Sequence, residues 1–424
     1  MNDKGALVVG GDYRGLGIVR SLGRQGIPVW VVQYGETLAG YSRYARRRLR
    51  WPESTEAGQI SYLLDLADEH DLKGWVLFPT TEETAWLISR NHAALSTKYR
   101  LTTSPWSEYS VAANKHLAYR RAESLGIDVP RTWYPGSMAE VAQLDLEFPV
   151  ILKPAVRITH NDFTDAKAWR IEDRGALLAR YESACKLLPA HEVMIQEVID
   201  GGGEHQLAFA AACRNGEALG FVTARRTRQY PIDFGRASTF VETIDRPDIV
   251  EPSLRLLASL RLTGLVEFEY KHDPRDGRMK LLDVNARSWG WHSLGSAAGV
   301  DFAHVAWRDA RGESVTPTQG RPGVRWVRLA IDLPVSAREI VAGRLSVRPY
   351  LRSLRPPIEG PIAAFDDPLP WLMDLPLLVG RAAKSSRRRL RRSETRKQRV
   401  GRRLMSVAQT STPVRLPRGD ERCE

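Results

Sequence analysis

Three polar side chains alternate at the end of an apolar strand in the segment KLLDVNARSWGWHSL, residues 280–294. Asp283, Asn285 and Arg287 stand at every second position, so a β-strand would point all three toward one face. A carboxylate, an amide and a guanidinium are costly to bury without partners. The pattern therefore predicts an edge that meets a metal ion and the anion bound to it.

A second pair of acids lies on the preceding predicted strand. Glu267 and Glu269 alternate in GLVEFEYKHDPRDG, and Asp276-Gly277 predicts the turn of a hairpin. Adjacent strands can bring Glu269 and Asp283 to one cation, with Asn285 completing the set. Magnesium prefers oxygen ligands and commonly takes one or two carboxylates plus substrate phosphates. Glu267 is an alternative ligand in place of Glu269.

Basic residues at three other places are suited to bind anions. Lys153 closes the buried strand FPVILKP, where a lysine projects a point charge into a cleft. Lys115 lies in the predicted helix NKHLAYRRAESLGI, where a solvated surface position explains it equally well. Arg228, in the arginine cluster RRTRQYP, is the candidate for holding a carboxylate or its acyl phosphate, with a solvated basic loop as the alternative.

The elements that position these residues fall into two regions. Residues 1–110 alternate short buried strands with helices, which predicts a small doubly wound domain with a parallel sheet. Residues 111–312 contain helices, buried strands and hairpins. A looser accessory segment, 313–380, and a basic tail, 381–424, which we expect to be disordered, complete the chain.

The glycine-rich turn after the first strand does not predict dinucleotide binding. Asp12 stands where the motif G-x-G-x-x-G requires its second glycine. Gln33 and Tyr34, rather than an acid, end the second strand. The turn is better explained as a strand-to-helix connection that holds at most a small anion.

The net charge of +12 belongs to one segment. Residues 381–403 hold twelve Lys or Arg and one Glu, which leaves about +1 for the other 401 residues. This tail lacks interleaved aromatic residues, so nucleic-acid binding is not predicted. The apolar stretch 371–379 before it predicts weak, salt-sensitive contact with acidic membranes, with a solvated tail as the alternative.

The thiols and the apolar runs favour a cytoplasmic protein. Three distant cysteines, without a C-x-x-C pair, argue against a disulfide framework or a zinc site. No secretory signal is visible, and no apolar run approaches the roughly 20 residues that span a bilayer.

These motifs, in this order, resemble the ATP-grasp superfamily. Residues from about 111 to 310 look like an ATP-grasp domain, and residues 1–110 look like the domain that precedes it. The resemblance implies an α/β fold, with a doubly wound parallel-sheet domain followed by a two-lobed α+β domain. The stretches RQYPIDFG and LLDVNARSWGWHSL are most similar to predicted carboxylate–amine ligases, the carboligases that resemble D-aspartate ligase.

The resemblance also implies a role for each site residue. Lys115 and Lys153 would contact the phosphates of ATP, and Arg287 and Arg228 would hold the phosphoryl group and the carboxylate. Glu269, Asp283 and Asn285 would bind Mg²⁺, for which Mn²⁺ can substitute, with Asp283 standing where glutamate is commoner. The segment MIQEVIDGGGE would supply the adenine and ribose contacts, through Gln196, Glu197, Val198, Ile199 and Glu204.

The activity implied is formation of an acyl phosphate from a small carboxylate and ATP, followed by attack of an amine or another nucleophile. Biotin carboxylase-like carboxylation is an alternative, but Trp291 stands where those enzymes place a glutamate, and no biotinylation motif is present. A nucleotide-binding scaffold without turnover is a second alternative, which the complete residue set disfavours. The family's glycine-rich flap is missing after Lys153, and Lys167 is expected to take over part of its work. Trp289, Trp291 and His292 are interpreted as packing residues, with substrate contact as an alternative for His292.

Overall fold

The computed structural model describes residues 5–156, 161–230 and 237–380. Met1–Asp374 form one compact unit and Leu375–Glu424 a second, of which the structure describes only the first six residues. The predicted basic tail, 381–424, lies outside the described residues. Among the helices that are described, none has the length and apolar character needed to cross a membrane.

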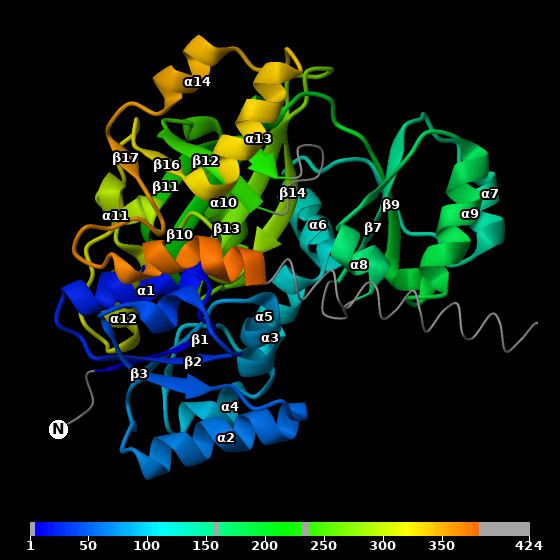
Figure 1. The fold of residues 1–424 in the computed structure, drawn as a ribbon. Coiled ribbons are helices and arrows are strands. Elements are labelled where there is room, and N and C mark those ends of the chain that lie inside the picture. The colour runs from blue at the N-terminus through cyan, green and yellow to red at the C-terminus, as the bar shows by residue number, and fades with distance from the viewer. Residues whose placement is uncertain (1–4, 157–160, 231–236, 381–424) are drawn as a thin grey trace, which may run out of the picture. The chain divides into compact units, whose positions relative to one another are not determined.

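The N-terminal region is a five-stranded parallel sheet with helices on both faces (Figure 1), as predicted. The strand order is β3 (Ala45–Arg50), β2 (Val29–Gln33), β1 (Ala6–Val9), β4 (Val76–Pro79) and β5 (Arg100–Leu101). Its helices are α1 (Tyr13–Arg24), α2 (Glu56–Glu69), α3 (Glu82–Arg90) and α4 (His92–Ser96), with a 3₁₀ turn, η1 (Leu38–Tyr41). Strand β1 is buried along its whole length, which explains its uninterrupted apolar sequence.

Two helices begin side by side at one edge of this sheet. Strands β1 and β4 are parallel neighbours, and α1 and α3 follow their carboxyl ends. Asp12 caps α1 by accepting from the backbone N–H of Arg14 at 2.9 Å, and Thr81 caps α3 by accepting from Thr84. Gly10 has φ +112°, a conformation that favours glycine in the turn before α1. Ligands of open α/β sheets bind outside the carboxyl ends of such strands.

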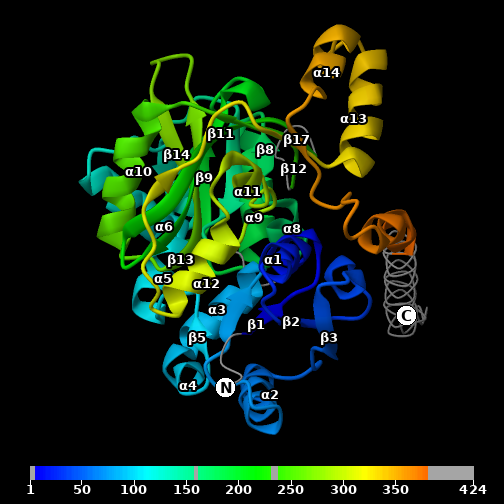
Figure 2. The ribbon, with the colours of Figure 1, turned by 90° about the vertical axis from the view of Figure 1, so that its left-hand side faces the viewer.

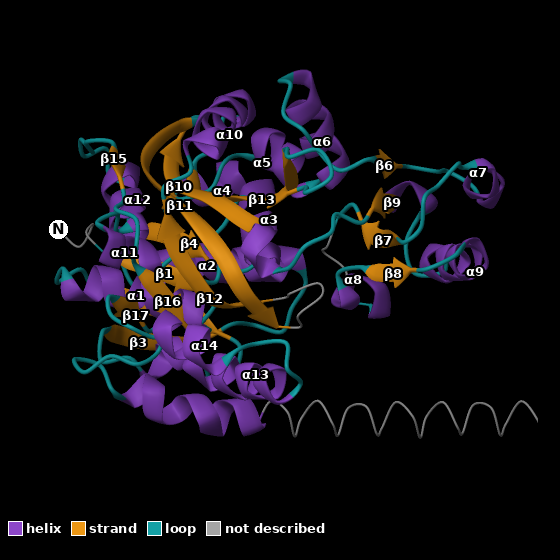
Figure 3. Ribbon diagram, turned by 90° about the horizontal axis from the view of Figure 1, so that it is seen from above, coloured by secondary structure: helices purple, strands orange, loops and turns teal. Residues whose placement is uncertain are grey.

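A four-stranded antiparallel sheet forms a small lobe, which stands apart from the larger sheet in Figure 3. Its strand order is β6 (Thr132–Trp133), β9 (Val193–Glu197), β7 (Val150–Pro154) and β8 (Trp169–Ile171). The helices α7 (Met138–Gln143), α8 (Asp162–Ala166) and α9 (Arg174–Cys185) and the turn η2 (Ala190–Glu192) complete the lobe. Phe163, Leu177 and Tyr181 fill its core against β7 and β9.

The larger sheet carries the predicted hairpin. Its strand order is β14 (Met279–Asn285), β13 (Gly264–His272), β10 (Gln206–Arg214), β11 (Glu217–Tyr230), β12 (Ala237–Ile244), β16 (Arg325–Val327) and β17 (Ile358–Glu359), and β15 (Thr318–Gln319) pairs with β11. Helices α5 (Trp106–Ala113), α6 (Lys115–Ser124) and α10 (Pro247–Leu260) pack their apolar sides against β10, β13 and β14 (Figure 2). The turn η3 (Gly203–His205) precedes β10, and α11 (Leu294–Ala298) and α12 (Phe302–Ala310) follow β14.

The segment after residue 312 is built into this same sheet. It supplies β15, β16 and β17, together with α13 (Leu329–Val341) and α14 (Val347–Ser353). Farther along, the buried carboxylate of Asp367 accepts from Arg20 at 2.9 Å, from Ser42 at 2.7 Å and from the backbone of Arg43 at 2.9 Å. The segment therefore ties the N-terminal domain to the larger sheet.

Candidate active site

Two cavities adjoin where the three sheets meet. The larger has a volume of about 340 Å³ and the smaller about 160 Å³. Four charged residues line both cavities and are called the shared wall below: Lys167, Arg226, Glu269 and Asp283. Molecules bound in the two cavities would therefore face each other across one cluster of charges.

The smaller cavity collects most of the residues predicted to bind the nucleotide. Apolar side chains such as Ile151 and Leu282 contribute to its walls, which suits an aromatic base. The predicted residues that line it are Lys115, Lys153, Gln196, Glu197, Val198 and Ile199.

Glu204 does not line either cavity, contrary to the prediction that it holds the ribose. Its side chain is 60% exposed and lies 3.6 Å from the ring of His205. The carboxylate also accepts from the backbone N–H of Gly202 at 3.2 Å, so it stays within its own turn. The glycine-rich turn of residues 201–203 directs this side chain away from the cavity.

Tyr119, which was not predicted from the sequence, binds two residues that line the smaller cavity, Lys153 and Gln196. Lys153 donates to the Tyr119 hydroxyl at 2.9 Å, Gln196 donates to it at 3.3 Å, and the hydroxyl donates to the carbonyl of Leu282 at 2.7 Å. Burial lowers the pKa of Lys153 from 10.5 to about 8, although the charges of Asp283 and Glu269 oppose the shift. Tyr119 follows Lys115 by four positions on α6, so helical spacing was the available signal.

The hairpin brings the predicted metal ligands together in the expected register. Glu269 lies directly opposite Asp283, and Glu267 lies opposite Asn285. Asn285 donates to Glu269 at 2.9 Å and to Glu267 at 3.1 Å. Neighbouring strands with a period of two thus place an oxygen-rich set at one point of the sheet.

Cations of the chain pair with these carboxylates in the structure. Lys115 donates to Asp283 at 2.7 Å, and Arg226 forms an ion pair with Glu269. Burial alone would raise the pKa of Glu269, but the charges of Arg226 and Lys167, together with the hydrogen bond from Arg226, lower that pKa. Within the described ranges, no group of three His, Cys, Asp or Glu side chains is arranged as a metal site.

The donor set nonetheless fits magnesium in its chemistry. Two carboxylates and one amide offer hard oxygen ligands, and the shared wall leaves substrate phosphates to supply the rest. Glu267 is buried and accepts from the indole N–H of Trp291 at 2.9 Å. Burial, reinforced by the charge of Glu269, raises the pKa of Glu267 to about 7. A bound Mg²⁺ would require Lys115 and Arg226 to release their carboxylates.

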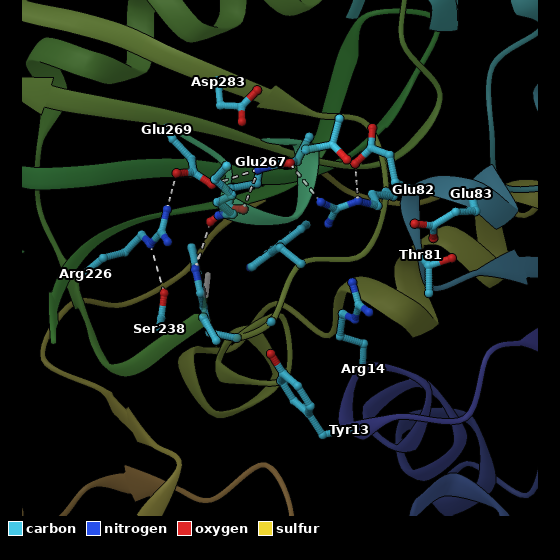
Figure 4. A pocket seen from close by; sticks show the side chains of 18 of the residues that line it. Tyr13, Arg14, Thr81, Glu82, Glu83, Arg226, Ser238, Glu267, Glu269 and Asp283 are labelled. Atoms are coloured by element: carbon cyan, nitrogen blue, oxygen red, sulfur yellow. Dashed lines mark hydrogen bonds and ion pairs between the residues drawn. The ribbon is translucent and has the colours of Figure 1, made fainter. Parts of the chain in front are cut away.

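Arg287 joins the hairpin to the N-terminal domain. Its Nε donates to Glu82 at 2.8 Å, at the start of α3, and its Nη2 donates to the side-chain oxygen of Asn285 at 3.1 Å. The guanidinium lines the larger cavity, where Figure 4 shows Glu82 facing the hairpin. Arg287 therefore lies beside the shared wall, in the larger cavity.

The structure corrects the choice of Arg228. Its guanidinium lies outside both cavities, bound to Asp332 at 2.8 and 2.9 Å and to the hydroxyl of Ser353 at 2.9 Å. Arg226 instead belongs to the shared wall, where its Nε donates to Ser238 at 2.9 Å (Figure 4). The pairing of β11 with β12 is irregular between residues 225 and 229, and such a bulge redirects side chains.

The remaining predictions concern the surroundings of the larger cavity. Lys167 lines both cavities, while residues 157–160 of the expected lid lie outside the described residues. Trp289 and Trp291 are buried and contribute to the larger cavity. His292 packs instead against α1, with its Nε2 2.9 Å from the carbonyl of Arg14, so it does not reach the larger cavity.

The fold is that of ATP-grasp enzymes, as the sequence resemblance implied. No protein-family model matches the chain. L-amino acid ligase from Bacillus licheniformis superposes with a TM-score of 0.54 at 16% identity, over 72% of this chain and 74% of that one. Biotin carboxylase from Campylobacter jejuni, solved with a β,γ-ATP complex, gives 0.57 at 16% identity, over 73% and 71%. At these identities the likeness concerns the fold.

Curated relatives share sequence as well. D-aspartate ligase from Enterococcus faecium is 26% identical over 271 residues, which cover 59% of this chain and 62% of that protein. The C-terminal section of the carbamoyl phosphate synthase large chain from Methanopyrus kandleri is 23% identical, over 49% of this chain and 41% of that one. The chain thus spans less than two thirds of each of these relatives.

Proposed function

We propose that the protein is a Mg-ATP-dependent ligase that joins a small-molecule carboxylate to an amine or another nucleophile through an acyl phosphate. The observation that carries this proposal is the shared wall, at which a mainly apolar cavity and a polar cavity meet at the predicted metal ligands. The similarity to D-aspartate ligase supports the same reaction class. ATP would occupy the smaller cavity and the carboxylate the larger one.

The reaction has two balanced steps. A carboxylate oxygen attacks the γ-phosphorus of ATP, the bond between that phosphorus and ADP breaks, and an acyl phosphate forms. The nucleophile then attacks the acyl carbon and expels inorganic phosphate, which retains one oxygen of the original carboxylate. The protein contributes mainly positioning and charge neutralisation in phosphoryl chemistry of this kind.

The residues of the shared wall and its neighbours would divide this work. Lys115, Lys153 and Arg226 hold phosphate oxygens, and Arg287 stabilises the charge that grows on the phosphoryl group. Glu269, Asp283 and Asn285 would hold Mg²⁺. The bound ion would neutralise charge on the phosphates of ATP.

Biotin carboxylase-like carboxylation is less well supported. The position expected to carry a catalytic glutamate is Trp291, whose indole is buried and donates to Glu267. An indole N–H is a donor only and has no free lone pair to accept a proton, so it cannot act as a general base.

The test measures ADP release from Mg-ATP with hydroxylamine as a small nucleophile, which converts acyl phosphates into hydroxamates. Amino acids and dicarboxylic acids form the panel, with D-aspartate included because of the relative described above. We expect one acid to give ADP and hydroxamate in equal amounts. Folded protein that binds Mg-ATP but releases AMP with any acid of the panel would contradict the proposed chemistry.

A further inference from the structure

Arg14 projects into the larger cavity from the N-terminal domain. It stands in the first turn of α1, and Figure 4 shows it across the cavity from Glu269 and Arg226. Its Nε and Nη2 donate to Asp12 at 2.9 and 2.6 Å, so the guanidinium is held along one edge. Among the described residues, its Nη1 has no hydrogen-bond acceptor. That nitrogen can therefore donate to a bound molecule.

Arg14 and Arg287 approach the same cavity from different domains. Both guanidiniums line it, and their positive charges repel each other across it. Each donates to an acid of the N-terminal domain, Arg14 to Asp12 and Arg287 to Glu82. An anion placed between two such cations would relieve the repulsion and accept hydrogen bonds from both.

The anion that meets both arginines has a defined place in the reaction. Arg287 donates to Asn285, one of the proposed metal ligands, and so lies next to the proposed site of phosphoryl transfer. A group that contacts Arg287 from the far side of the cavity is therefore the one about to attack the phosphorus. We propose that Arg14 binds the carboxylate of the acyl substrate opposite Arg287, so that the N-terminal domain selects the acid. This inference rests on the proposed ligase function.

The surroundings of Arg14 also indicate the class of acid. Glu82 and Glu83, at the start of α3, line the same cavity. A second carboxylate on the substrate would be repelled beside these acids and an ammonium group would be attracted, although less strongly at Glu82, whose charge Arg287 partly offsets. The substrate that fits best is thus a small amino acid rather than a plain dicarboxylic acid.

The experiment measures binding of D-aspartate, L-aspartate, L-alanine and succinate to the full chain in the presence of a non-hydrolysable Mg-ATP analogue. Aspartate and succinate differ by the amino group alone, so they form a matched pair of probes. We expect an amino acid to bind wild type more tightly than succinate does. Arg14→Gln should weaken that binding about 10- to 100-fold, since a charged hydrogen bond is lost. Binding of the nucleotide analogue, which contacts the other cavity, should be unchanged.

Arg24→Gln is the matched control. Arg24 lies on the same helix and also pairs with an aspartate, Asp366 at 2.8 Å, but it does not line the larger cavity. This variant should bind the amino acid as wild type does. Arg14→Lys retains the charge and should recover part of the affinity, and it carries the test if Arg14→Gln fails to fold.

Three outcomes would overturn the inference. The first is that Arg14→Gln binds the amino acid as tightly as wild type does. The second is that wild type binds succinate at least as tightly as aspartate. The third is that wild type loaded with the analogue binds none of the four acids. Failure of wild type to bind the Mg-ATP analogue is a different result, because it removes the proposed ligase function itself.

Discussion

Lys115 and Arg226 each pair with a residue predicted to bind metal. Lys115 contacts Asp283 at 2.7 Å, and the buried Arg226 contacts Glu269. Both cations lie within reach of the smaller cavity, where the phosphates of ATP are expected. If Mg-ATP binds as proposed, Lys115 and Arg226 would leave these carboxylates and contact phosphate, and the carboxylates would contact the metal ion instead.

Removal of Arg287 should abolish turnover and leave most of the nucleotide affinity. In Arg287→Ala, a donor that acts mainly in the transition state is lost, so we expect kcat to fall about 100- to 1,000-fold with a small change in KM for ATP. Steady-state ADP release measures both constants. Because the change also leaves Glu82 without its partner, thermal unfolding must show that the variant is folded. Normal turnover by folded Arg287→Ala contradicts the assigned role.

Lys153 should make nucleotide binding sensitive to pH near 8. Its folded-state pKa is about 8, below the ordinary 10.5, because burial disfavours its charged form. Phosphate binding requires the charged form, so the Kd for Mg-ATP should rise above pH 8, approaching about tenfold per pH unit. Titration calorimetry between pH 7 and 9.5 measures how the Kd for Mg-ATP depends on pH. The variant Lys153→Met should bind Mg-ATP weakly, and its Kd should not change with pH over this range. A wild-type Kd that is constant over this range argues against phosphate contact by Lys153.

The same shift affects stability with the opposite sign. Between the folded pKa of about 8 and the ordinary 10.5, the unfolded chain binds more protons at this site than the folded chain. The contribution of Lys153 to the free energy of unfolding therefore increases as pH rises through this window.

At the scale of elements, Arg228 is a structural link between β11 and α13. Its bidentate partner Asp332 is fully buried, and its guanidinium also lies over the rings of Phe240 and Tyr350. Arg228→Ala would leave a buried carboxylate without its partner and should lower the free energy of unfolding by about 3–5 kcal/mol. Chemical denaturation measures this change. The double variant Arg228→Met/Asp332→Leu should recover much of the loss, whereas a stable single variant that fails only in turnover would restore the catalytic assignment.

The pairing of residues in the hairpin was predictable from sequence. Which of the arginines of β11 lines the cavities was not. Strand alternation has a period of two, so Glu269 and Asp283 could be assigned to one face and one neighbour pair. The irregular pairing of β11 leaves no local signature, so sequence favoured Arg228 over Arg226. The direction of the Glu204 side chain was not predictable for a similar reason, because it depends on the conformation of a glycine turn.

Contacts between distant elements were also beyond sequence reasoning. The alternation of apolar strands and helices in the first 110 residues predicts a parallel sheet, and the structure contains this sheet. The strands β15, β16 and β17 are two or three residues long, too short to stand out as a pattern. Arg14 lies in a turn for which the sequence predicts at most a small anion, and the cavity that it lines depends on a hairpin some 270 residues later.

At the scale of the whole molecule, the basic segment 381–403 should act independently of the site. We expect the full chain to bind vesicles of anionic lipid at low salt and to leave them at high salt, since each Lys or Arg near such a surface contributes about 1 kcal/mol. Vesicle sedimentation measures this, with neutral vesicles as the control. A chain ending at residue 380 should lose the binding and retain its affinity for Mg-ATP. Equal sedimentation of both chains would remove the membrane hypothesis.

The central claim is that the larger cavity presents a carboxylate to the γ-phosphorus of ATP held in the smaller one. Transfer of ¹⁸O from a labelled carboxylate tests this most directly, with the acid found in the hydroxylamine assay as substrate. One labelled oxygen should appear in the inorganic phosphate for each ADP formed, because the acyl–oxygen bond breaks in the second step. Label found in AMP, or phosphate released without label, would contradict it.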